Sequence, residues 1–157
     1  MLKIPKKLSV NLSIAISVVL FLICVAGAFI MPALVNLLID TPDNIGNRGD
    51  IREVGRVFVH VMAYLVLAAV MLADYLMFRL LFRVREGEVF TAKSVALIRG
   101  VSWCCYLLCA AFCGIGIYFQ LAFIVAFAAL FLGTCLRVVK NVIEEATEIK
   151  SENDLTV

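Results

Sequence analysis

The chain has 157 residues, of which 64% are hydrophobic and 17% are charged, and its formal net charge is +2. Average soluble domains have roughly 45–50% apolar and about 25% charged residues. This composition and the mean hydropathy of +1.05 exclude a soluble globule, because a small domain cannot bury so much apolar surface, and nothing in it points to direct nucleic-acid binding.

The first apolar segment starts with a basic stretch, as a signal peptide does. Its apolar part runs for about thirty residues, whereas a cleaved signal has roughly 7–15. We therefore expect a retained membrane helix, kinked at Pro32. The next apolar segment, from Val54 to Phe82, is long enough to be a second membrane span.

One further run, 101–139, carries a single charge, Arg137, and is about twice the length of one membrane span. It must fold back on itself, and glycines predict the turn near Gly114–Gln120. Thr91, with Phe90 before it and Val95 four residues later, predicts an N-cap with a hydrophobic staple at the start of the third helix.

These segments predict an all-α, multi-pass protein with one membrane domain. The expected helices are about 10–39, 54–82, 92–116 and 120–149, and a short tail covers 150–157.

Lys and Arg residues concentrate at the N-terminus, in the loop between the second and third helices, and in the tail. The first loop has more acids than bases, and the third loop has no basic residue. The positive-inside rule therefore places both termini and the second loop in the cytoplasm. We expect a protein of the bacterial inner membrane.

All six cysteines lie in apolar runs, so a secreted disulfide framework is absent. Cys105, Cys109 and Cys113 share one helical stripe, and Cys113 with His60 could supply half of a metal site. Zinc needs about four converging ligands. Packing of reduced thiols is the favoured interpretation, a redox or metal role is the alternative, and no metal or cofactor is predicted.

Asp74 is the one acid within an apolar span, which makes it a candidate intramembrane polar site. It lies five residues before Arg79, or about 7.5 Å along a helix. We expect an ion pair with Arg137 of the fourth helix, and the alternative is a transport or sensing role. Asn36 and Gln120 also place polar groups in apolar surroundings.

Small residues recur along the fourth helix at spacings that allow close helix approach, either within one chain or in a homo-oligomer. They are Ala122, Ala126, Ala129 and Gly133.

The fourth helix continues beyond the membrane with one apolar stripe in four-three alternation. The stripe is formed by Cys135, Val139, Val142, Ala146 and Ile149. Its flanking acids disfavour an anionic lipid surface, so a protein should cover it. The second loop of the same chain, through Arg83 and Arg85, is one candidate, and a second protein is the other.

The last residues, Leu155 to Val157, also fit a loose pattern for capture of a C-terminal carboxylate. The candidate partner-binding residues are Glu144, Glu145, Glu148, Glu152, Asp154, Leu155 and Val157.

The ending EIKSENDLTV and the block GEVFTAKSVALIRGVSW resemble the bacterial membrane family known as domain of unknown function 2975. The likeness spans nearly the whole chain; residues 150–157 stand as that family has them, and Phe90 and Thr91 match its aromatic-hydroxyl pair. The cysteine-rich third helix departs from the pattern, so the resemblance implies nothing about those thiols.

The resemblance implies an inner-membrane protein without known activity, often encoded beside a small helix-turn-helix regulator. We therefore predict a sensor or tether, not an enzyme, that engages such a regulator through its tail and second loop. The alternative is a small transporter, channel or immunity-type membrane subunit that uses Asp74. A third alternative is a subunit of a larger complex.

Overall fold

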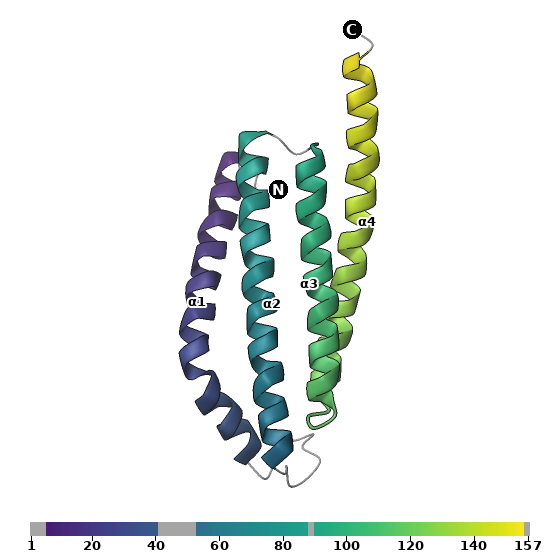
Figure 1. Ribbon diagram of the computed structural model, residues 1–157. Coiled ribbons are helices and arrows are strands. Elements are labelled where there is room, and N and C mark those ends of the chain that lie inside the picture. The colour runs from purple at the N-terminus through teal and green to yellow at the C-terminus, as the bar shows by residue number, and fades with distance from the viewer. Residues whose placement is uncertain (1–5, 41–52, 88–89, 156–157) are drawn as a thin grey trace, which may run out of the picture.

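The computed structural model describes residues 6–40, 53–87 and 90–155, which form four long helices (Figure 1). They are α1 (Lys6–Asp40), α2 (Glu53–Glu86), α3 (Ala92–Gly116) and α4 (Ala122–Leu155). All four are long and apolar enough to cross a bilayer. The predicted all-α fold with four membrane-spanning helices is confirmed.

Large apolar side chains cover the outside of the helices. Phe29 of α1 and Phe127 of α4 are 83% and 71% exposed. A helix satisfies its backbone hydrogen bonds internally, so it can present such side chains to lipid without leaving polar groups unpaired. The exposed apolar surface therefore indicates contact with a lipid bilayer.

The helix ends follow local sequence signals. Thr91 caps α3 with extended backbone angles, and its hydroxyl accepts a hydrogen bond from the Ser94 amide at 3.3 Å. Gly87 follows α2 with φ +85°, a left-handed conformation that glycine adopts without steric cost. The short turn 117–121 joins α3 to α4, close to the predicted position.

Three helices extend past their apolar stretches. α1 begins at Lys6, α2 reaches Glu86 and α4 reaches Leu155, so most of the predicted tail is helical. Lys, Arg and Glu are good helix formers, and a helix can therefore continue into polar sequence. Figure 1 also shows a bend in the second half of α1, the half that contains Pro32.

The helices pack in chain order, α1 on α2, α2 on α3 and α3 on α4. Within the described ranges, no close backbone approach joins α4 to α1 or α2. The buried cluster near the 117–121 turn includes Val35, Val59 and Phe119. The start of α1, the end of α2, the start of α3 and the end of α4 lie at one end of the molecule, and α4 projects beyond the others (Figure 1).

Candidate functional site

Asp74 lies buried between α1 and α2, with 7% of its surface exposed. Its Oδ1 accepts a hydrogen bond from the Ser17 hydroxyl of α1 at 2.7 Å. Both residues line a cavity of about 240 Å³ between the two helices. A carboxyl group, a hydroxyl group and a cavity therefore meet inside an apolar helix pair.

The predicted ion pair between Asp74 and Arg137 is wrong. The Arg137 guanidinium carbon lies 5.3 Å from the ring centroid of Trp103 and 5.8 Å from that of Tyr106, both in α3. α4 packs beside α3 and makes no close backbone approach to α2 in the described part of the chain. Arg137 therefore makes cation–π contacts, and Asp74 has a neutral partner on α1.

The other polar candidates do not join this site. Asn36 is exposed on α1, nineteen residues beyond Ser17, and Gln120 is exposed in the turn after α3. At 1.5 Å per residue, Asn36 lies about 28 Å along the helix from Ser17. The two amides are therefore separated from the Asp74 cavity.

The cysteines are all free, and Cys24 and Cys104 are buried, whereas Cys113 is exposed. The His60 ring Nδ1 lies 2.8 Å from the backbone oxygen of Arg56, one turn earlier. Among the described residues, no three His, Cys, Asp or Glu side chains are placed to hold a metal ion.

The small residues of α4 face α3. Ala122 and Ala126 are buried, and a Cβ atom at Gly133 would lie 3.2 Å from Cys105 Cβ. The absence of a side chain at Gly133 lets the two backbones approach closely. Packing within one chain thus uses this face.

The apolar stripe of α4 lies on another face and stays largely exposed. Val142 is 60% exposed and Ile149 is 54% exposed, and Cys135 and Val139 are exposed too. Residues on the neighbouring face, including Lys140 and Ile143, are half-buried. Ala146 is half-buried, and the other four residues of the stripe stay exposed in the described part of the chain.

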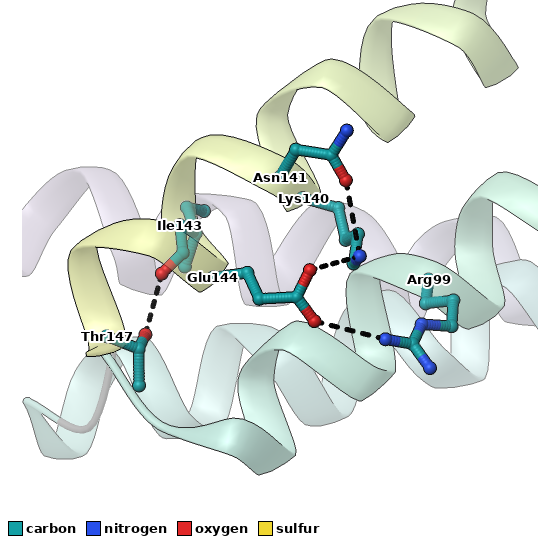
Figure 2. Close-up of polar contacts among 6 residues, drawn as sticks. All are labelled: Arg99, Lys140, Asn141, Ile143, Glu144 and Thr147. Atoms are coloured by element: carbon teal, nitrogen blue, oxygen red, sulfur yellow. Dashed lines mark hydrogen bonds and ion pairs between the residues drawn. The ribbon is translucent and has the colours of Figure 1, made fainter. Parts of the chain in front are cut away.

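Glu144 links the polar part of α4 to α3 (Figure 2). It accepts a hydrogen bond from Arg99 at 3.2 Å and forms an ion pair with Lys140, which also donates to Asn141. The hydrogen bond from Lys140 lowers the pKa of the Glu144 carboxyl below its usual value. Glu144 therefore joins α4 to α3 through a half-exposed ion pair.

The second loop was one candidate to cover the stripe, with Arg83 and Arg85 near the acids of α4. The basic partner of Glu144 is instead Arg99 of α3. Within the described ranges, α2 makes no close backbone approach to α4.

The remaining candidate partner-binding residues extend along the free end of α4. Glu145, Glu148 and Glu152 are exposed. Asp154 and Leu155 belong to the last helical turn, but their side chains lie outside the described part of the structure, as does all of Val157. The exposed acids flank Val142 and Ile149 at helical spacings.

Sequence reasoning missed Ser17, Trp103 and Arg99 as partners. Ser17 carries one weak signal, because Ser13 and Ser17 lie four residues apart on one face of an apolar helix. No signal showed which helix that face would contact.

Within the described residues, fold and site define a multi-pass membrane protein with four helices, a buried carboxyl group and a helix end that extends past its neighbours. The chain belongs to the family described as "Protein of unknown function (DUF2975)", whose model matches residues 51–157. The match covers α2, α3 and α4 and leaves out Ser17 with the rest of α1. No curated protein and no solved structure matches the chain.

Proposed function

We propose that this protein is a membrane tether or sensor, without enzymatic activity, that binds a small cytoplasmic regulator on the free end of α4. The observation that carries the proposal is the exposed stripe at Val142 and Ile149, flanked by Glu145, Glu148 and Glu152. An apolar surface with acidic borders fits a partner that is apolar at its centre and basic at its edges.

The charge distribution supports a cytoplasmic position for this surface. The end of the molecule that carries it also carries the basic end of α2, with Arg79, Arg83 and Arg85. Basic residues are retained on the cytoplasmic side of the bacterial inner membrane. A DNA-binding regulator has a basic surface that could meet the acids of α4, as the family resemblance suggests.

A binding measurement with a small helix-turn-helix regulator, of the kind that the family resemblance implies as the product of a neighbouring gene, tests this function. The full-length protein in nanodiscs is immobilised, and binding of the purified regulator is followed at several salt concentrations. We expect affinity to fall as salt rises. Reversal of the three acids, Glu145, Glu148 and Glu152, to Lys should weaken binding at least about tenfold, because like charges would then meet across the interface.

Glu86→Lys is the matched control, since it reverses an exposed acid at the same end of the molecule but on α2. Truncation before Lys150 tests the last turns of α4 separately. Equal binding by the wild type and the triple variant, or no binding by either, would contradict the proposed function.

A transporter, channel or immunity-type subunit is the second candidate function. It is favoured by the buried Ser17–Asp74 hydrogen bond beside a cavity of about 240 Å³. Asp74→Asn should then abolish flux in reconstituted vesicles at normal protein levels. Undiminished flux would exclude Asp74 from that role.

A further inference from the structure

The buried carboxyl group of Asp74 has no charged partner in the described part of the chain. Its one hydrogen bond comes from the neutral hydroxyl of Ser17. Arg79, the next basic residue on α2, places its guanidinium carbon 6.0 Å from the ring centroid of Tyr75. A cation placed in the cavity would therefore find a buried carboxyl group that no described basic side chain already pairs with.

The cavity beside Asp74 has the lining of an organic ligand site. Besides Ser17 and Asp74, its walls contain the aromatic rings of Phe21, Tyr75 and Phe78 and two aliphatic side chains. Tyr75 and Phe21 are 51% and 41% exposed on the outside of the helix pair. A ligand dissolved in the lipid can therefore reach the cavity directly.

The chemistry of the walls selects among ligands. A hard metal ion takes six or more oxygen ligands, and these walls offer a carboxyl group with few other oxygens. A plain acyl chain makes no polar contact with the carboxyl group, and an anion finds no basic side chain among the residues that line the cavity. A cation with an apolar body satisfies both the carboxylate and the aromatic rings.

We infer that the cavity between α1 and α2 binds a monovalent organic cation with an apolar body, of the alkyl- or aryl-ammonium class. Asp74 balances its charge, Ser17 orients the carboxylate, and Phe21, Tyr75 and Phe78 contact its body. The site belongs to α1 and α2, which make no close backbone approach to α4 within the described residues. Failure of partner binding at α4 would therefore leave this inference intact, and the reverse also holds.

Equilibrium dialysis with radiolabelled benzyltrimethylammonium tests the site. The full-length protein in a non-ionic detergent should bind the probe saturably with one site per chain. Asp74→Asn, which keeps the shape and can still accept the Ser17 hydrogen bond, should weaken binding at least tenfold. Ser17→Ala and Phe21→Leu should each weaken it several-fold.

Glu86→Gln is the matched control, because it removes one exposed acid from the same helix outside the cavity. Gel filtration and Trp103 fluorescence check that each variant is folded. If Asp74→Asn does not fold, Phe21→Leu decides, because it removes a ring without changing charge. Absence of saturable binding, wild-type affinity in Asp74→Asn or Phe21→Leu, or an equal loss in Glu86→Gln would overturn the inference.

Nanodiscs distinguish the two sources of an ammonium group. Probe binding is measured in nanodiscs of phosphatidylglycerol alone and in nanodiscs that also contain phosphatidylethanolamine. The binding that remains in Asp74→Asn is subtracted as background in each lipid. Weaker binding in the second lipid identifies a headgroup ammonium as the competing natural occupant. Equal binding excludes the headgroup and leaves a free organic cation as the source, and both results are consistent with the same chemistry.

Discussion

Replacement of Gly133 by Val should separate α4 from α3. A Cβ atom at this position would lie 3.2 Å from Cys105 Cβ and from a ring carbon of Tyr106. Carbon atoms in favourable contact are about 3.5–4.0 Å apart. Because the Cys105 Cβ is attached directly to the backbone, it cannot move aside without a shift of α3.

The magnitude follows from two opposing effects. Gly133→Ala requires a shift of a few tenths of an ångström but gains up to about 1 kcal/mol in helix propensity, so the unfolding free energy should change by less than about 1 kcal/mol. Gly133→Val adds two more methyl groups at a β-branched position. Overpacking of this kind typically costs about 1–3 kcal/mol, so Val should destabilise clearly where Ala does not.

Trp103 provides the assay, because it is the one tryptophan of the chain and its ring contacts Arg137 of α4. Unfolding in mixed micelles, followed by tryptophan fluorescence, should show a lower midpoint and an altered native spectrum for Gly133→Val. Leu132→Val is the control, since Leu132 is 57% exposed on the same helix. An unchanged midpoint and spectrum in Gly133→Val would refute the close approach of α3 and α4.

Three other predictions concern the buried carboxyl group, the cation–π contact and the orientation. Ser17→Ala should lower the unfolding free energy by about 1–3 kcal/mol, because the buried Asp74 loses its hydrogen-bond donor. Addition of Asp74→Leu to this variant should recover much of the loss. Thermal denaturation in detergent checks both, and no loss in Ser17→Ala would contradict the prediction. Arg137→Gln should shift the Trp103 emission and destabilise by about 0.5–1 kcal/mol, and an unchanged spectrum would argue against the stacking. A green fluorescent protein fused after Val157 should fluoresce and a fused alkaline phosphatase should stay inactive, whereas an active phosphatase would reverse the proposed orientation.

The exposed stripe of α4 was predictable as a pattern, although its surroundings were not. Its apolar residues recur at heptad spacing, and this shows that one face of the helix is apolar. Whether α3 covers that face depends on the rotation of α4 about its own axis. In the structure, Gly133 and the half-buried Lys140 lie on the face of α4 that packs on α3. Val142 and Ile149 therefore lie on the outward face.

Asp74, between α1 and α2, shows the same point: the sequence alone did not show which helices are adjacent. Its burial in an apolar span was readable from its neighbours in sequence, but its partner was assigned to the wrong helix. A carboxyl group will pair with any donor within reach, and reach depends on which helices are adjacent. Because α2 separates α1 from α3, and α3 separates α2 from α4, Ser17 is near Asp74 and Arg137 is not.

Hydropathy and local caps by themselves determined the four spans and the start of α3 at Thr91, because lipid requires long apolar helices and an exposed helix end requires a hydrogen-bond acceptor. Those are properties of each segment alone. The tertiary structure decided the lateral order of the helices and the rotation of each one. These depend on contacts between residues far apart in sequence, and they set the hydrogen bond of Asp74 and the exposure of the α4 stripe.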